Sequence, residues 1–309
     1  MQAGHAIPGV VYLGRDWLLY ADPDLRFNLS ENVAPALVFG HNGFLWPCQG
    51  IRPPGDTWLH LYAVDLARAP DGRWWVVADR TQAPSGPGYA MATRRIISRV
   101  MAGLHRSTPL ARLRGFFQTF SASLQDASPT ATEPPRVVLL TPGPGSETAF
   151  EQAYLATLLG FPLVEGQDLT VRDEKVWLRT LDGLQRVHVI LRRVDDIWCD
   201  PLELREDSAL GVAGLVAAVR AGKVTVANAL GSGILETGAL LGYLPRLAEH
   251  LLGQKLKMPS VATWWCGQPR EQSIVIDNLD AMSVAPAFRS AGGGLSGEIA
   301  TFALFLFRL

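Results

Sequence analysis

Two strand-like runs stand out in the hydrophobic pattern of the first third of the chain. Residues 57–65 (TWLHLYAVD) alternate and are rich in β-forming residues, and residues 73–79 (RWWVVAD) follow the dipeptide Asp71-Gly72. Two strand-like runs on either side of an Asp-Gly pair are typical of a β-hairpin. We therefore predict a hairpin here, followed by a polar loop rich in proline and glycine over residues 79–89.

The segments on either side of this hairpin predict further elements. The apolar run ALVFG at residues 36–40 precedes a turn signal at Asn42-Gly43 and predicts a short buried strand. Apolar residues recur at three- and four-residue spacing over 90–125, which predicts helical structure. The polar, proline-rich segment 128–135 follows, and we expect a domain boundary there.

The second half of the chain alternates between strand and helix patterns. Strands are predicted at residues 136–141, 162–166 and 224–229, helices at 148–159, 210–220 and 235–252, and a second hairpin joins 176–180 to 187–192. We expect Gly160 to end the first of these helices and Pro245 to bend or split the last. Such alternation is typical of a parallel sheet, so the predicted fold class is α/β.

Composition narrows the class of protein. The chain has 309 residues, of which 48% are hydrophobic and 18% charged, as expected for a globular protein of one or two domains. The net charge of −1 indicates no overall basic field, so we expect no nucleic-acid and no membrane partner. Three cysteines without a CxxC pair argue against a disulfide framework and a cysteine zinc site, and favour a cytoplasmic location. The apolar run 299–309 is shorter than a membrane span.

Two carboxylates of the predicted hairpin are candidates for a metal site. Asp65 and Asp79 lie near the ends of its two strands, so they can approach each other across the hairpin. Carboxylate oxygens are the ligands that Mg²⁺ prefers, and Mg²⁺ uses only one or two of them. The alternative is a surface ion pair between Asp79 and Arg80 beside a turn.

Other patterns each carry two interpretations. The loop at residues 142–146 (PGPGS) joins a strand to a helix and is either an anion site or a tight turn. Arg192 and Arg193 follow a strand, and either bind a phosphate or carboxylate or form salt bridges with nearby acidic residues. Residues 263–267 (TWWCG) either stack on a ligand or belong to the core.

Long segments of the chain resemble one known family. They are ALVFGHNGFLWPCQG (36–50), LHLYAVDLARAPDGRWWVVADRTQAPSGPGYA (59–90), PRVVLLTPGPGSETAFEQAYLATLLGFPLVEGQDLTVRD (135–173), VILRRVDDIWCDPLELREDSALGVAGLVAAVRAGKVTVANALGSGILE (189–236) and PSVATWWCGQP (259–269). In this order they resemble the circularly permuted ATP-grasp proteins, type 2, from about residue 35 to residue 288.

The resemblance implies a permuted ATP-grasp fold with a Rossmann-like parallel-sheet domain. We expect an N-terminal ATP-grasp part over 1–127, the Rossmann-like part over 134–288 and an aberrant tail over 289–309. The implied activity is ATP-dependent ligation of a small carboxylate to an amine through an acyl-phosphate, with Mg²⁺. The residue roles that follow are Asp65 and Asp79 for metal, Arg80, Ser85, Gly86 and Arg94 for nucleotide, and Arg192 and Arg193 for a substrate carboxylate.

Three departures from the family pattern argue against ligase activity in this chain. Related permuted ATP-grasp enzymes hold Mg²⁺ with an Asp and a later Glu-x-Asn pair, and in this chain the Glu and Asn positions are Ala78 and Arg80. The family's GYALENR segment reads GYAMATR at residues 88–94. The lysine that the family places against nucleotide phosphates is Ala285 here. Family members also extend further at both ends. We therefore expect either a ligase, with a C-terminal half encoded separately, or a truncated, catalytically inactive copy that acts as a binding subunit or is a non-functional remnant.

Overall fold

The computed structural model describes residues 33, 35–130, 134–286 and 302–305 of the chain. These residues form two compact units, each assembled from segments far apart in the sequence. Unit 1 takes its described residues from Met1–Gly50, Tyr62–Thr81 and Gly231–Leu309, and unit 2 consists of Ile51–Leu61 and Gln82–Leu230. The domain boundaries expected from the sequence, at 127/134 and 288/289, stay a prediction.

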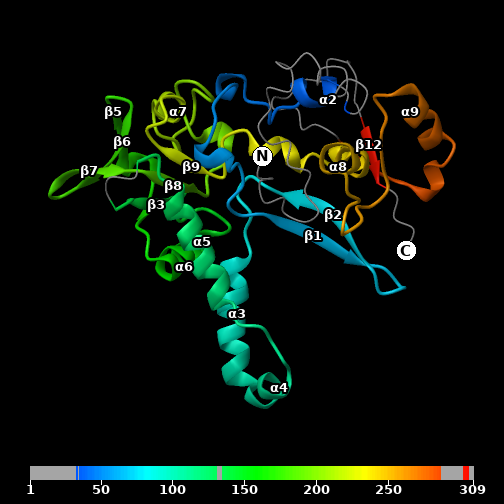
Figure 1. The fold of residues 1–309 in the computed structure, drawn as a ribbon, viewed down its shortest axis with the longest axis horizontal. Helices are drawn as coiled ribbons and strands as arrows, with labels where there is room; N and C mark the ends of the chain where they lie inside the picture. The colour runs from blue at the N-terminus through cyan, green and yellow to red at the C-terminus, as the bar shows by residue number, and fades with distance from the viewer. Residues whose placement is uncertain (1–32, 34, 131–133, 287–301, 306–309) are drawn as a thin grey trace. The chain divides into compact units, whose positions relative to one another are not determined.

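The centre of unit 2 is a parallel sheet with strand order β4-β3-β8-β9 (Figure 1). Its strands are β3 (Val137–Leu140), β4 (Leu163–Val164), β8 (Val189–Arg192) and β9 (Thr225–Ala227). Every residue of β3 and β8 is buried, as expected for strands covered on both faces. Helix α6 (Ala149–Leu159) connects β3 to β4, and α7 (Leu215–Arg220) lies between β8 and β9 along the chain. The parallel sheet agrees with the predicted α/β fold class.

Three further helices precede this sheet in unit 2. They are α3 (Pro87–Val100), α4 (Ala102–Ser107) and α5 (Arg114–Asp126). Phe117, Phe120 and Leu124 of α5 pack with Leu139 of β3 and Leu155 of α6 in one buried apolar cluster. The periodic apolar positions of α5 therefore cover the sheet. A separate antiparallel sheet consists of β5 (Leu169–Arg172), β6 (Lys175–Thr180) and β7 (Gly183–Val187).

Unit 1 contains the predicted hairpin. Its strands are β1 (Ala63–Arg68) and β2 (Trp74–Arg80), and a second sheet has the order β10-β12-β11. The strands of that sheet are β10 (Thr263–Trp265), β11 (Ser283–Pro286) and β12 (Phe302–Phe305), and the helices are α2 (Pro35–Phe39), α8 (Leu244–Leu252) and α9 (Pro269–Ile276). Val76 of β2 packs with Leu37, Leu247 and Trp265 in the core of this unit. Within the described residues, no helix is long and apolar enough to cross a bilayer.

Most predicted elements are confirmed. Gly160 ends α6 in a left-handed conformation, and Pro245 lies in the first turn of α8, after two short 3₁₀ segments that divide the predicted helix. The hairpin around Asp71-Gly72 forms as β1 and β2. Trp265 is buried in the core of unit 1, which agrees with the core interpretation of residues 263–267.

The helical structure predicted over 90–125 is confirmed as α3, α4 and α5, with Pro109 in the break between α4 and α5.

Two details of the predicted pattern are wrong. Residues 36–39 belong to helix α2 and not to a strand, because a short apolar run does not distinguish the two and Pro35 suits the start of a helix. The partner of β6 is β7, whereas the apolar run at residues 189–192 joins the parallel sheet as β8.

The core of unit 2 yields a matched pair of stability predictions. Leu155 is fully buried, whereas Leu181 at the turn between β6 and β7 is 106% exposed. We expect Leu155→Ala to lower the free energy of unfolding by about 2–5 kcal/mol, because a cavity remains in the core. Leu181→Ala should lower it by less than about 0.5 kcal/mol, since it buries nothing. Urea denaturation measures both, and equal losses would contradict the assigned core.

Candidate functional site

The loop that enters α3 is held by two buried charged residues of unit 2. The Glu151 Oε1 atom accepts hydrogen bonds from the backbone N–H groups of Gly86 at 2.6 Å and Gly88 at 3.0 Å. The Arg193 Nη1 atom donates to the carbonyl oxygen of Pro84 at 2.9 Å. One side chain from α6 and one from the end of β8 thus fix a loop that comes much earlier in the sequence.

These two residues are also each other's counter-ions. The Arg193 Nη2 and Glu151 Oε2 atoms lie 3.8 Å apart, and the two side chains are 2% and 0% exposed. Among the residues that the structure describes, Glu151 Oε2 and Arg193 Nε have no hydrogen-bond partner. Burial lowers the pKa of the Arg193 guanidinium, and the negative charge of Glu151 opposes that change. Removal of one partner would leave an uncompensated buried charge.

Two glycines of the loop are required by this arrangement. Gly86 has a φ of +124°, a conformation that strains any residue with a side chain. A Cβ atom at Gly88 would lie 2.7 Å from the Cγ atom of Glu151, closer than packed atoms approach. The Gly-Pro-Gly sequence therefore permits the carboxylate to approach the backbone, and Pro87 lacks an N–H group that would need a partner.

The α3 N-terminus already has an anion beside it. The positive end of a helix favours a negative charge, and Glu151 supplies one through the N–H groups of Gly86 and Gly88. Ser85 is exposed beside it, and within the described residues its hydroxyl has no hydrogen-bond partner. Arg94 lies two turns into α3, where its guanidinium donates to the carbonyl oxygen of Ala111. The structure thus places Ser85 and Gly86 in one loop, with Arg94 on the helix that follows.

Arg192 is buried in the same unit. Its guanidinium donates to the carbonyl oxygens of Asn228 at 3.0 Å, Val194 at 3.0 Å and Ala229 at 3.4 Å. Asp196 lies 4.0 Å away. Both arginines assigned to a substrate carboxylate are thus engaged with the backbone and with acidic side chains of the protein itself. Their role in substrate binding stays a prediction.

In unit 1, the hairpin separates the two predicted metal ligands. Asp65 pairs with Ala78 across the hairpin, and Asp79 pairs with Val64, so the two aspartates project from opposite faces. Asp65 accepts hydrogen bonds from Arg80 at 2.6 and 3.2 Å. Asp65 and Asp79 therefore do not offer two carboxylates to one Mg²⁺ ion.

A different acidic neighbour lies beside Asp79. Asp79 is buried and accepts a hydrogen bond from the Tyr62 hydroxyl at 2.6 Å. Burial raises the pKa of Asp79, the hydrogen bond from Tyr62 lowers it, and the negative charge of Glu236 raises it. Glu236 itself accepts the N–H of Thr81 at 2.7 Å. Within the described residues, no group of three or more His, Cys, Asp or Glu side chains is arranged to hold a metal.

Sequence patterns did not single out Glu236 or Glu151. Glu236 is 155 residues from its hydrogen-bond partner Thr81, a separation that no local motif spans. Glu151 is the only acidic residue of α6, whose sequence is AFEQAYLATLL. A lone acidic residue in an apolar helix was the available signal, because buried charges are rarely left without a partner.

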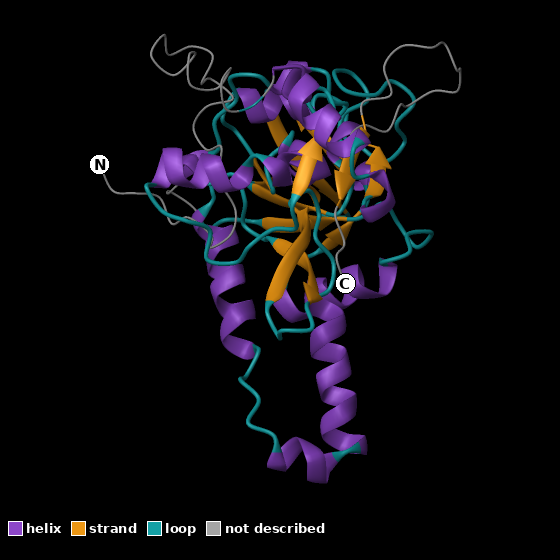
Figure 2. Cartoon of the chain, turned by 90° about the vertical axis from the view of Figure 1, so that its right-hand side faces the viewer, coloured by secondary structure: helices purple, strands orange, loops and turns teal. Residues whose placement is uncertain are grey.

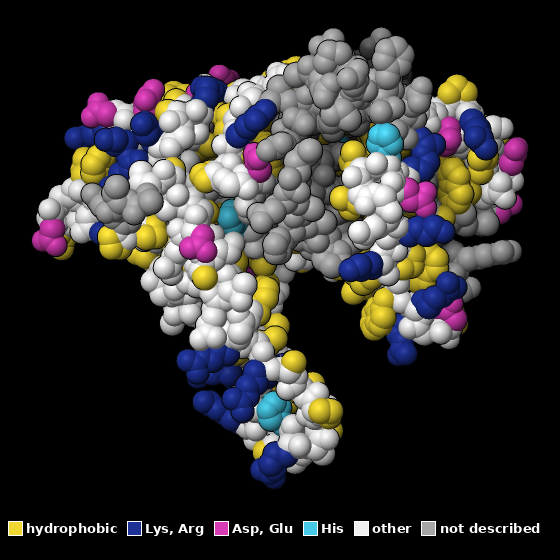
Figure 3. All heavy atoms as spheres, in the orientation of Figure 1, with side chains coloured by type: hydrophobic (Ala, Val, Ile, Leu, Met, Phe, Trp, Pro, Cys, Tyr) yellow, Lys and Arg dark blue, Asp and Glu magenta, His cyan; other side chains and the backbone are white. Residues whose placement is uncertain are grey.

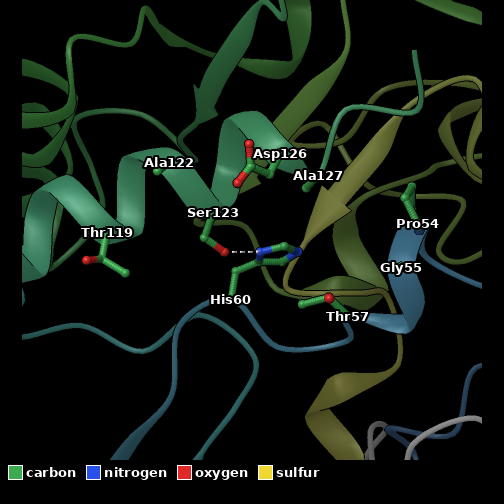
Figure 4. Close-up of a pocket in the computed structure, with 9 residues that line it drawn as sticks. All are labelled: Pro54, Gly55, Thr57, His60, Thr119, Ala122, Ser123, Asp126 and Ala127. Atoms are coloured by element: carbon green, nitrogen blue, oxygen red, sulfur yellow. Dashed lines mark hydrogen bonds between the residues drawn. The ribbon is translucent and has the colours of Figure 1, made fainter. Parts of the chain in front are cut away.

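A separate cavity of about 350 Å³ lies in unit 2, between α5 and the segment that contains His60 (Figure 4). The His60 Nδ1 and Ser123 Oγ atoms are 2.9 Å apart on its wall, and Asp126 lines it on the same helix as Ser123. Asn228 Oδ1 accepts the backbone N–H groups of His60 at 2.7 Å and Leu61 at 3.1 Å. Burial lowers the pKa of His60 to about 4, so its imidazole is neutral at pH 7.

The loop at residues 142–146 is a tight turn with an acidic neighbour. Gly143 has a φ of +98° and donates its N–H to the Thr141 hydroxyl at 3.0 Å. A Cβ atom at Gly143 would lie 3.3 Å from Glu165 Oε1, so a carboxylate lies against this turn. That negative charge favours the turn interpretation over an anion site.

Comparison with known proteins decides the family. A family model described as circularly permuted ATP-grasp type 2 matches residues 26–302. The chain belongs to the circularly permuted ATP-grasp type 2 family. The predicted resemblance is thereby confirmed, and the loop at Ser85, the Asp79–Glu236 pair and the parallel sheet of unit 2 are parts of an ATP-grasp protein.

The relatives of this ATP-grasp chain are longer than the chain. It is 48% identical over 260 residues to an uncharacterized protein of Mycobacterium tuberculosis. The matched region covers 84% of this chain and 29% of the relative. It is also 35% identical over 268 residues to an uncharacterized protein of Synechocystis. That matched region covers 86% of this chain and 56% of the relative. The chain therefore spans less than two thirds of these relatives.

The buried pair under the Ser85 loop predicts a large loss of stability when one charge is removed. Glu151→Gln keeps an oxygen for the N–H groups of Gly86 and Gly88 but removes the largest negative charge acting on the buried Arg193. We expect this change to lower the free energy of unfolding by about 3–5 kcal/mol, measured in urea. Limited proteolysis should also cut faster at the exposed Ser85.

The control is an exposed ion pair of the same type. Glu203 lies 2.5 Å from Arg220, and their side chains are 29% and 46% exposed. Because solvent screens such a pair, Glu203→Gln should cost less than about 1 kcal/mol. A Glu151→Gln protein as stable as the Glu203→Gln protein would contradict the role of Glu151.

His60 predicts a pH dependence of stability. Its pKa of about 4 in the folded state lies below the ordinary histidine pKa of 6.5, so the unfolded chain binds the proton more tightly. The free energy of unfolding should therefore rise by about 3 kcal/mol at most as the pH increases from about 4 to 6.5. The variant His60→Asn should lose this slope in urea titrations, and His250→Gln, a change at an exposed histidine on α8, should retain it. Equal slopes in both variants would refute the assignment.

Proposed function

We propose that this chain is the nucleotide-binding part of an ATP-dependent ligase that joins a small carboxylate to an amine. The family match over residues 26–302 carries this proposal. Ligases of this chemistry activate the carboxylate as an acyl-phosphate, and the charge on the transferring phosphoryl group must be neutralised. The acid and the amine are small molecules whose identity the binding residues leave open.

The Ser85 loop is proposed to bind the nucleotide phosphates. Glu151 and Arg193 hold its backbone, so Ser85 is presented on a rigid segment with a free, exposed hydroxyl. The Ser85 hydroxyl would donate a hydrogen bond to a phosphate oxygen and so orient the phosphate group. Arg94, on the helix that follows, provides positive charge in the same unit. Arg80, assigned to the nucleotide from the sequence, lies in unit 1, where it is paired with Asp65.

Asp79 and Glu236 are proposed as the carboxylates for Mg²⁺, in place of Asp65 and Asp79. They are two acidic side chains close enough for the charge of one to raise the pKa of the other, and Mg²⁺ uses one or two such ligands. Asp65 does not fit, because it projects from the opposite face of the hairpin and is paired there with Arg80. When bound, Mg²⁺ would neutralise phosphate charge.

A second candidate function is a catalytically inactive binding subunit. The observation in its favour is Ala285, on β11, where the family pattern has a lysine. The two candidates differ in whether the purified chain binds ATP.

Isothermal calorimetry of the full chain with ATP tests the first candidate. We expect a Mg²⁺-dependent heat that weakens by about tenfold or more in Asp79→Asn and in Glu236→Gln, because each removes a ligand charge. Asp71→Asn is the control, since Asp71 is an exposed aspartate of the same hairpin, at the turn. Absence of heat from a folded protein would overturn nucleotide binding and favour the inactive subunit.

A further inference from the structure

A helical arm extends from unit 2. It consists of α3, α4 and the return segment to the start of α5, residues 87–114. Figures 1 and 2 show the arm running away from the parallel sheet, with α4 at its far end. The side chains at this end are exposed on a convex tip, and among the described residues Ile96, Val100, Met101, Leu104 and Leu110 each expose 46% or more of their surface.

The arm carries a dense positive charge without acidic partners. Its arginines are Arg94, Arg95, Arg99, Arg106, Arg112 and Arg114, and no Asp or Glu occurs from residue 80 to residue 125. Figure 3 shows Lys and Arg side chains gathered on the arm with hydrophobic side chains beside them. The net charge of −1 for the whole chain conceals this local excess, because acidic residues elsewhere balance it.

The exposed apolar residues of the arm lie around the junction of α3 and α4. Ile96 and Val100 follow one another at four-residue spacing, which places them on one face of α3. At Met101 the backbone leaves the helical conformation (φ −120°, ψ 50°), so Leu104 belongs to a separate helix, α4. The result is an exposed apolar patch with arginines beside it, a combination that suits a membrane surface.

We propose that this arm docks on a membrane surface rich in anionic phospholipids. The apolar patch enters the interface between headgroups and acyl chains, and the arginines contact the phosphate groups. A convex tip favours lipid over a partner protein, because a fluid interface needs no complementary pocket. Aliphatic side chains at the tip favour lipid over nucleic acid, which is bound through stacking aromatic and polar side chains. The docking does not depend on the proposed nucleotide site.

Co-sedimentation of the full chain with vesicles tests the proposal. We expect binding to vesicles of phosphatidylcholine and phosphatidylglycerol in equal amounts, and little binding to phosphatidylcholine alone. Each arginine removed should weaken binding roughly fivefold at low salt, and added salt should weaken the binding of the unchanged protein. The test variants are Arg99→Gln with Arg106→Gln, and Val100→Ser with Leu104→Ser.

The control variants carry the same changes away from the arm. Arg179→Gln alters an exposed arginine of β6, and Ile276→Ser alters a 60% exposed residue at the end of α9. Both should bind the anionic vesicles as the unchanged protein does. All altered side chains are exposed, so thermal unfolding should shift little.

Four outcomes would overturn the proposal. They are no binding to anionic vesicles, equal binding to both vesicle types, binding that the arm variants leave unchanged, and a dimer that forms without lipid and is lost in Val100→Ser with Leu104→Ser. A single-stranded RNA oligonucleotide serves as a competing probe. Displacement of vesicles by that RNA, with its binding lost only in the arginine variants, would assign the arm to nucleic acid instead.

Discussion

The buried ion pair between Glu151 and Arg193 determines where the Ser85 loop lies. Two charges in a site from which water is excluded must compensate each other, and each also binds loop backbone that no other described side chain satisfies. The pair connects α6, the end of β8 and the start of α3, which are elements of one unit but distant in sequence. A change at any of the three therefore moves the loop.

This constraint shows that residues with binding chemistry can serve the fold. Arg192 and Arg193 have the chemistry of phosphate or carboxylate recognition, yet the protein uses their guanidinium groups on its own carbonyl oxygens and on Glu151. Ser85 keeps an exposed hydroxyl, and Asp79 lies beside the negative charge of Glu236. The proposal of a nucleotide and cation site rests on these groups.

The net charge of the whole chain conceals the positive charge of the arm. A net charge of −1 excludes a large uniform field, but it does not exclude a segment with six arginines and no acidic residue. The field of that segment is felt within about 10 Å, the Debye length at moderate salt, which is shorter than the arm itself. The distribution of charged residues along the chain and over the surface, and not the net charge, therefore indicates a binding surface.

Local chemistry in the sequence was sufficient for the α/β class, the hairpin at Asp71-Gly72, the end of α6 at Gly160 and the family, because turns, caps and periodicity depend on neighbouring residues. It was insufficient for α2 and for the assignment of residues 189–192 to the parallel sheet. Burial and partner choice decided these, as they did the separation of Asp65 from Asp79 and the approach of Glu236. Those contacts join residues far apart in the sequence, and no local pattern encodes a pairing that exists only once the chain has folded.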